Sequence, residues 1–173
     1  GDGTEAVEVT ADQLTARAGG AITLDTAIAT ADLASPVAGA IGIDETDAIT
    51  LASVVTSDGS ITVEAGGTLT ATRVDSSATD DDTNDVTLTT TAGDIAVVSI
   101  TAGSANDVTL TSSGAITEDG LAGTVLTADL LTAGAGGAIT LDTTVATGDL
   151  ASTVAGAIDI DETDDAILTS ITT

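Results

Sequence analysis

The chain has 173 residues and a net charge of −26, and it contains no Phe, Trp, Tyr, Met, Cys, His or Lys. Two arginines against 28 carboxylates would repel phosphate backbones and anionic lipids, so the charge argues against nucleic-acid and membrane-surface partners. General acid–base and nucleophilic catalysis usually depends on the missing side chains, so we expect that the protein is not an enzyme.

The apolar content is nevertheless high enough for a folded core. Hydrophobic residues make up 42% of the chain, nearly all of them Ala, Val, Ile and Leu, which argues against disorder. No apolar run approaches the roughly 18–20 residues that cross a bilayer, so we expect no membrane insertion. The chain has no initiator Met and no visible signal peptide, and we interpret it as a piece of a longer protein.

A short block recurs along the whole chain: a turn-forming Gly, Asp or Asn, one further residue, and then an aliphatic–polar–aliphatic triplet. Because Gly, Asp and Asn accept tight-turn backbone conformations, each block predicts a corner followed by a strand. Fourteen blocks fall into seven pairs, with anchors eight or nine residues apart within a pair. The anchors, meaning the first aliphatic residue of each block, pair as Leu14 with Ile22, Ile41 with Ile49, Ile61 with Leu69, Val86 with Ile95, Val108 with Ile116, Leu131 with Ile139, and Ile158 with Ile167.

The triplets have the period of two that is typical of half-buried strands, and no segment has convincing helical periodicity. Further aliphatic patches, such as Val54 with Val55, follow most pairs and predict a third strand in each turn. We therefore expect an all-β fold, a parallel β-helix solenoid of about seven turns of roughly 23 residues, with three strands per turn and equivalent anchors stacked. Ile95 and Ile116 should then point inward in one column with Ile49 and Leu69.

A long internal repeat lies over these blocks. Residues 10–47 return as residues 127–164, at an offset of 117 residues and with 31 of 38 positions identical. Five pairs of blocks fit in one 117-residue unit, and the chain covers about one and a half units. We therefore expect residues 1–173 to form a single continuous segment of a longer tandem array. The alternative is a string of immunoglobulin-like sandwiches, against which stand the missing Trp and Tyr and the five-fold subdivision.

The Gly-x-Ile-Thr-Leu/Val blocks about 20 residues apart, rich in Ala, Thr, Gly and Asp, resemble the filamentous-haemagglutinin-type and related giant repetitive adhesins of bacteria. The resemblance covers nearly the whole chain. It implies a right-handed β-helix shaft that is secreted and displayed outside the cell. The amino-terminal secretion domain of that family, with its Asn-Pro motifs, has no counterpart in this sequence.

An acidic segment is the strongest candidate for cation binding. Oxygen ligands stand at alternate positions, Asp80, Asp82 and Asn84, as at the start of an EF-hand-type calcium loop. The motif is incomplete, because the Gly expected at its sixth position is Asp85 and the Glu expected at its twelfth is Thr91. The sequence leaves two interpretations open: a Ca²⁺ site or a solvated acidic loop between two turns.

The acidic corner at residues 44–47 recurs unchanged at residues 161–164 and is a second cation candidate. We interpret it instead as a polar corner that prevents lateral association. Outward threonines should form two columns. One column is expected to contain Thr15, Thr62, Thr87, Thr109 and Thr132, and the other Thr23, Thr50, Thr70, Thr117 and Thr140.

Regular threonine arrays on a flat β-helix can bind ice, but Thr is also simply a good outward strand residue. Interruptions at Gly42, Ala96, Asp159 and Leu168 favour the second interpretation. The expected function is a structural or adhesive shaft segment of a long extracellular bacterial surface fibre in a cation-rich medium. Its expected partners are divalent cations and other copies of the chain, by head-to-tail continuation or filament stacking. The alternatives are a Ca²⁺-dependent module that binds a glycan or ice, and tandem immunoglobulin-like adhesin repeats.

Overall fold

Alternating aliphatic and threonine residues form the strands of one continuous sheet in a computed structural model of the chain. The structure describes residues 9–120, 126–154 and 156–173. Within these ranges there are sixteen strands, every strand pairing is parallel, and no residue is helical. The predicted all-β parallel solenoid is therefore confirmed, and immunoglobulin-like sandwiches, which pair their strands antiparallel, are excluded.

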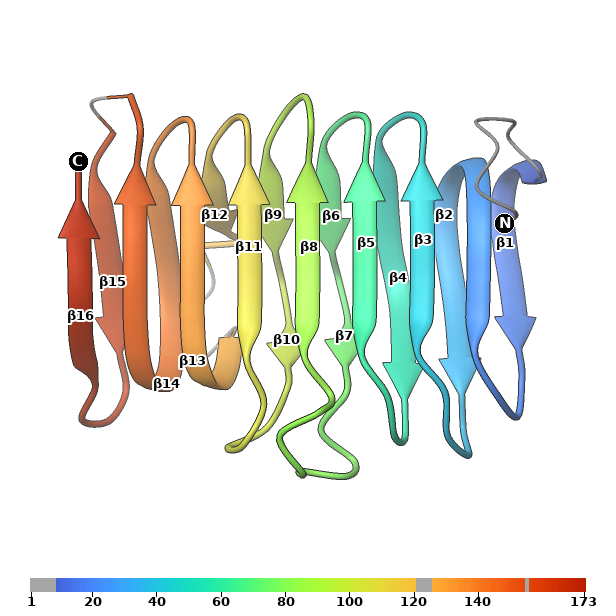
Figure 1. Cartoon of the computed structure of the whole chain (residues 1–173). Coiled ribbons are helices and arrows are strands. Elements are labelled where there is room, and N and C mark those ends of the chain that lie inside the picture. Colours follow the sequence, from blue (N-terminus) through green and yellow to red (C-terminus); the bar gives the residue numbers. More distant parts are fainter. Residues whose placement is uncertain (1–8, 121–125, 155) are drawn as a thin grey trace.

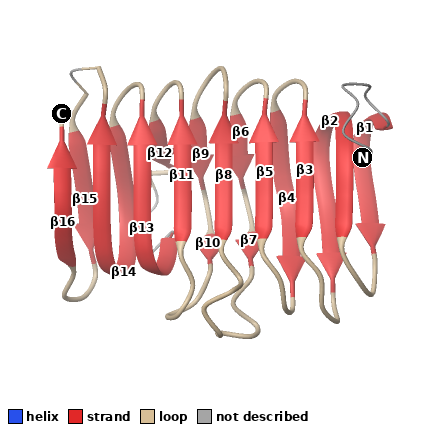
Figure 2. Cartoon of the chain, in the orientation of Figure 1, coloured by secondary structure: helices blue, strands red, loops and turns tan. Residues whose placement is uncertain are grey.

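The sheet coils into a flattened solenoid with two layers (Figures 1 and 2). The chain rises in the front layer, crosses the top edge, descends in the back layer and returns to the front one position further along, which makes the coil right-handed. The front strands are β3 (Ile41–Glu45), β5 (Ile61–Ala65), β8 (Val86–Thr90), β11 (Val108–Ser112) and β16 (Ile167–Thr172).

The back layer contains β1 (Val9–Arg17), β4 (Ile49–Thr56), β6 (Leu69–Ala71), β7 (Val74–Asp75), β9 (Ile95–Val97), β10 (Ile100–Thr101), β12 (Ile116–Glu118) and β15 (Ile158–Glu162). Three longer strands bend around an edge of the rod and belong to both layers. They are β2 (Ile22–Ser35), β13 (Leu126–Ala135) and β14 (Ile139–Ser152).

Two aliphatic columns run through the interior, one from each layer. Strand register stacks the front column as Ile41, Ile61, Val86, Val108 and Leu131, and the back column as Ile49, Leu69, Ile95, Ile116 and Ile139. All ten side chains are buried. The expected inward stacking of Ile95 and Ile116 with Ile49 and Leu69 is confirmed. Small branched side chains fill the narrow space between the layers, so the core needs no aromatic residue.

In the central turns the back-layer strand is split into two short pieces. The N–H groups of Thr72 and Arg73 both donate to the carbonyl oxygen of Leu51, at 3.0 and 3.3 Å, and the same arrangement recurs one turn later at Ala71. This shared acceptor bulges the backbone between β6 and β7 and between β9 and β10. The third strand of each central turn is therefore a continuation of the second strand in the same layer.

The amino-terminal turns are shorter than the spacing of the sequence blocks predicts. Leu14 pairs with Ala31, 17 residues on, and Ile22 pairs with Ile41, 19 residues on. The expected stacking of Leu14 on Ile41 and of Ile22 on Ile49 is wrong. The reason is that β2 is one continuous 14-residue strand, which turns the edge without a loop.

The second copy of the repeat has the same short turns. Leu131 pairs with Gly148 and Ile139 pairs with Ile158, because β14 is also a continuous 14-residue strand. The expected stacking of Ile158 on Leu131 is therefore wrong as well. These short turns bring the total to about eight turns, close to the seven that the sequence predicts.

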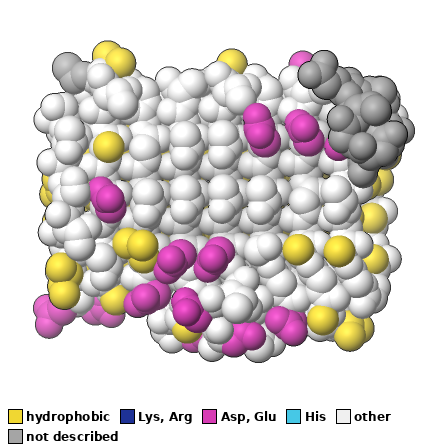
Figure 3. Space-filling model, in the orientation of Figure 1, with side chains coloured by type: hydrophobic (Ala, Val, Ile, Leu, Met, Phe, Trp, Pro, Cys, Tyr) yellow, Lys and Arg dark blue, Asp and Glu magenta, His cyan; other side chains and the backbone are white. Residues whose placement is uncertain are grey.

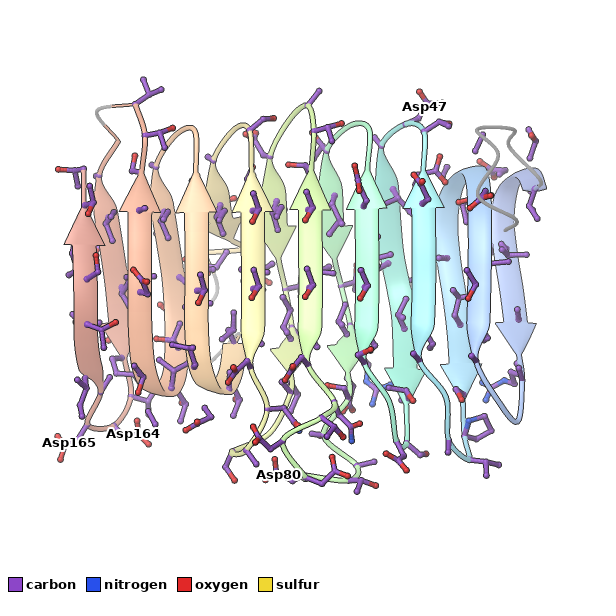
Figure 4. The ribbon with its side chains drawn as sticks, viewed as in Figure 1. Asp47, Asp80, Asp164 and Asp165 are labelled. Carbon is purple, nitrogen blue, oxygen red and sulfur yellow. The ribbon has the colours of Figure 1, made fainter. Side chains whose placement is uncertain are left out.

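The two copies of the repeat lie on opposite layers of the rod. Five register steps lead from Ile22 along the front column to Leu131, and a further half turn leads to Ile139 in the back column. Since Ile139 is the equivalent of Ile22, one 117-residue unit spans five and a half turns. Figure 4 shows the result: Asp47 lies at the top edge and its equivalent, Asp164, at the bottom edge.

Candidate functional site

The acidic segment predicted from the sequence lies in the loop between β7 and β8, at the bottom edge of the rod, where Figure 4 labels Asp80. The loop packs against the connection between β10 and β11 in the following turn. Carboxylates gather along this edge of the face that Figure 3 shows. The loop is therefore an acidic projection from an otherwise regular rod.

The carboxylate of Asp80 links these two connections by hydrogen bonds. Its Oδ2 accepts hydrogen bonds from the Oγ of Ser104 at 2.6 Å and the N–H of Ser104 at 3.1 Å. Its Oδ1 accepts from the N–H of Ala105 at 2.7 Å and the Nδ2 of Asn106 at 3.3 Å. The Ser104 hydroxyl, followed by the Ala105 N–H, lowers the pKa of Asp80. Gly103, at φ +106°, gives the carboxylate room, because a Cβ there would lie 2.6 Å from its Oδ1.

Asn84 belongs to a buried ladder of asparagines. Its Oδ1 accepts from the N–H of Gly59 at 2.6 Å, and its Nδ2 donates to the carbonyl oxygen of Thr79, also at 2.6 Å. Asn106, one turn later, repeats the arrangement: its Oδ1 accepts from the N–H of Asn84 at 3.0 Å and its Nδ2 donates to the carbonyl oxygen of Ala102 at 2.8 Å. Both amides therefore satisfy backbone groups where the chain leaves the sheet.

The three predicted metal ligands are thus in different situations. Asp80 and Asn84 both contact Asn106, whereas Asp82 is exposed at φ 66° on the turn between them. In the part of the chain that the structure describes, no group of three or more carboxylates is arranged to hold a metal ion. The Ca²⁺ site at Asp80, Asp82 and Asn84 stays a prediction that rests on the spacing of oxygen ligands in the sequence.

A second acidic group lies beside the ladder. Burial is the main cause that raises the pKa of Asp107, and the charges of Asp85, Asp129 and Asp82 raise it further. The N–H of Asp107 donates to Oδ1 of Asp85 at 2.9 Å, so successive turns hold these two aspartates close together. The pKa values of Asp80 and Asp107 are therefore shifted in opposite directions, that of Asp80 by the hydrogen bonds it accepts and that of Asp107 by burial and neighbouring negative charge.

The repeated acidic corner contains a structural carboxylate, Glu45, that the sequence analysis did not single out. Glu45 is 1% exposed, and its side chain points into the rod. Its Oε2 accepts from the Oγ1 of Thr26 at 2.7 Å and the N–H of Ile28 at 2.8 Å, and its Oε1 accepts from the N–H of Asp47 at 3.2 Å. It therefore ties the bend of β2 to the corner of the next turn. The alternation of the strand indicates this burial, because side chains at alternate positions point inward and position 45 follows Ile41 and Ile43 in that series.

The second copy repeats this arrangement at Glu162. Its Oε2 accepts from the Oγ1 of Thr143 at 2.7 Å, and the N–H of Val145 lies 3.3 Å from both carboxylate oxygens. Oε1 also accepts from the N–H of Thr163 at 3.0 Å. Glu162 is only partly buried. The corner at residues 44–47 is thus a buried carboxylate flanked by exposed polar residues, and the corner at residues 161–164 is the same arrangement with a partly buried carboxylate.

The front layer presents a broad face on which regular ranks of side chains are neither charged nor apolar (Figure 3). Thr62, Thr87, Thr109 and Thr132 are register neighbours, as expected. Thr15 is not, because the short first turn pairs it with Asp32 in the back layer.

The back-layer rank is likewise confirmed over most of its length. Its members stack as Thr50, Thr70, Ala96, Thr117 and Thr140. Thr23 was expected at its start, but it pairs with Gly42 in the front layer. Both corrections follow from the continuous bend of β2.

The structure contains no helix, among the described residues, that is long and apolar enough to cross a membrane. Fold and surfaces together define a class of protein, the parallel β-solenoid rod. Comparison with protein-family models, curated proteins and solved structures finds no match.

Proposed function

We propose that the chain is a segment of a structural shaft in a long extracellular bacterial surface fibre, with no catalytic role. The observation that carries this proposal is the continuity of the parallel sheet, with aliphatic residues on its inner side, through both copies of the repeat. Each copy adds turns of the same cross-section to the same core. A repeat of this kind gives the molecule length, which is the property that a shaft requires.

The mechanics of the rod support this role. Strands in neighbouring turns are separated by about 4.8 Å, so the five and a half turns of one repeat unit advance the rod by roughly 26 Å. The hydrogen bonds between turns run along the rod, and each turn is buried by its two neighbours. Bending or splaying the rod would expose aliphatic side chains that are now almost wholly buried, such as Leu88 and Leu110.

The setting outside the cell is supported by the resemblance of the Gly-x-Ile-Thr-Leu/Val blocks to giant bacterial adhesins. The net charge of −26 fits a medium with abundant cations, because dissolved ions screen repulsion between the carboxylates. Ca²⁺ bound at Asp80, Asp82 and Asn84 would stabilise the acidic loop of such a shaft in that medium.

The test is a series of chains with one, two and three 117-residue units, measured by small-angle X-ray scattering and electron microscopy. The expected result is a rod of constant cross-section whose length increases by about 26 Å per added unit. A matched variant with Gly replacing Ile at positions 61 and 95 in each unit should lose the linear increase, because the core is interrupted. Chains that look like separate beads, or whose length does not follow the unit count, would contradict the shaft.

A further inference from the structure

Three successive strand pairings of the first copy recur in the second copy with every partner shifted by 117 residues. The pairs and their counterparts are Leu14 with Ala31 and Leu131 with Gly148, Ile22 with Ile41 and Ile139 with Ile158, and Thr30 with Thr50 and Thr147 with Ile167. Even the irregularity in the pairing after Ala31 recurs after Gly148. The second copy therefore repeats the winding of the first, strand by strand.

The two copies differ in the layer and the edge that each strand and corner occupies. The block that begins at Ile22 starts in the front layer, whereas the block that begins at Ile139 continues the back column after Ile116. The corner after β3 carries Asp47 at the top edge, and the corner after β15 carries Asp164 at the bottom edge (Figure 4). The half-turn shift thus exchanges both layers and both edges at once.

This relation between the copies is a screw operation. It combines a half rotation about the rod axis with an advance of five and a half turns, which is about 26 Å. The operation is defined by strand pairings inside the rod, so each further unit with the same sequence should follow the same rule. Two successive operations amount to eleven turns, or about 53 Å, and restore the original layer and edge.

The acidic loop occurs once in the 117-residue unit, at the bottom edge where the chain returns from β7 to β8 (Figure 1). It has ten residues, 76–85, whereas the neighbouring connections 57–60 and 102–107 have four and six. The hydrogen bonds from Ser104 and the next residue to Asp80 hold it against the following turn. The loop is therefore a fixed projection that marks one edge of its unit.

We infer that an array of these units has a two-fold screw axis along the rod and displays the acidic loop alternately on its two edges. This inference rests on the proposed shaft function and describes the interaction surface of that shaft. Neighbouring loops on one edge are about 53 Å apart, with a loop on the opposite edge halfway between them. A partner that contacts two loops along one edge must span that distance, and a partner with a shorter reach contacts one loop only.

The test measures distances between loops in a chain of three units. Ala78 is exposed in the loop and the chain has no cysteine, so Ala78→Cys in chosen units attaches spin labels to the loops alone. Double electron–electron resonance compares labels in the first and second units with labels in the first and third. We expect about 53 Å for the second pair. The first distance should clearly exceed half of the second, because labels on opposite edges are separated by the width of the rod as well. A first distance equal to half of the second would place all loops on one edge and overturn the inference.

Duplication of residues 86–107 in each unit is the matched control. It adds one complete turn and no half turn, because Val86 pairs with Val108. The distance between the first and third loops should increase by about 10 Å, and the first distance should stay above half of it. Scattering from the same chains separates the two proposals. If the rod lengthens by about 26 Å per unit while the loops lie on one edge, the screw axis is wrong and the shaft stands. A length that does not follow the unit count contradicts both.

Discussion

The two copies of the repeat are nearly the same in sequence but not in surroundings. Residues 10–47 and 127–164 form the same bent strands and the same short turns, yet they lie on opposite layers. Ile43 and Glu45 are 4% and 1% exposed, whereas their equivalents Ile160 and Glu162 are only partly buried. Local conformation therefore follows the sequence of each copy, and burial depends on the turn that covers it.

The largest effect on stability is expected from core substitutions made at equivalent positions of the two copies. Ile43→Asp buries an unpaired charge under a covering turn and should lower the free energy of unfolding by about 3–5 kcal/mol. Ile160→Asp should cost clearly less, because a carboxylate at the partly exposed end stays in contact with water. Chemical denaturation of the two variants gives the comparison. Equal losses would mean that the second copy is covered as fully as the first.

The next pair concerns the buried carboxylates. Glu45→Ala leaves the hydroxyl of Thr26 and the N–H of Ile28 without their acceptor and should cost about 1–3 kcal/mol. Glu162→Ala should cost less, because Glu162 is only partly buried and lines an open cavity, so water can fill the space that its side chain leaves. Thr26→Val is the control that removes one donor and keeps the carboxylate. If Glu45→Ala were neutral, the role of this residue in holding the bend of β2 would be wrong.

A pH series compares Asp80, in the loop between β7 and β8, with Asp107, in the connection between β10 and β11, and neither residue lies in a copy of the repeat. The pKa of Asp107 is raised above its ordinary value of 3.8, so the folded chain holds this proton more tightly than the unfolded chain does. Its contribution to stability therefore falls as the pH rises from 3.8 through the raised pKa, and Asp107→Asn should raise the melting temperature at neutral pH.

The pKa of Asp80 is shifted in the opposite direction, so its effect on stability changes with pH in the opposite sense. Because its pKa is lowered from 3.8, it stabilises the folded chain above that value, and the contribution is lost as the pH falls through the lowered pKa. Asp80→Asn should therefore lower the melting temperature at neutral pH. Melting curves of both variants at neutral and acid pH give the test. A shift of the same sign for Asp80→Asn and Asp107→Asn at neutral pH would contradict these assignments.

The smallest expected effect is that of calcium. Millimolar Ca²⁺ should raise the melting temperature more than Na⁺ does at matched ionic strength, and Asp82→Ala should reduce the gain. Asp82 is the informative position because it is exposed, whereas Asp80 has a structural role in the same loop. If the two salts act equally, the ions only screen charge and the predicted site is absent.

The middle of the rod could be predicted from the sequence because its turns have loops at both edges. There each anchor begins a strand, so Ile61, Val86 and Val108 stack as the spacing predicts. The stacking of the strands in the two copies of the repeat, towards the ends of the rod, could not be predicted in this way. A continuous strand that bends has no loop between its two halves, so its sequence does not show where it passes from one layer to the other, and the positions of Ile22 and Ile158 in the stack were misjudged by half a turn.

The candidate site was predicted less well than the fold. Oxygen spacing identified the acidic loop, but the hydrogen bonds that fasten Asp80 to Ser104 and Asn84 to Asn106 join residues 22 to 24 apart in the chain. Such partners follow from the register between turns, which local spacing does not contain. Glu45 was overlooked because a charged residue in an acidic corner suggests exposure, although its strand phase points inward.

The half-turn shift between the two copies is the central claim, and disulfide cross-linking within one molecule tests it most directly. Asp159→Cys is combined either with Thr140→Cys, its register neighbour in the back layer, or with Thr132→Cys in the front layer. We predict that oxidation rapidly closes the 140–159 pair and leaves the 132–159 pair reduced, because a disulfide requires Cα atoms within about 7 Å. Closure of the 132–159 pair instead would place the second copy on the same layer as the first and would contradict the account.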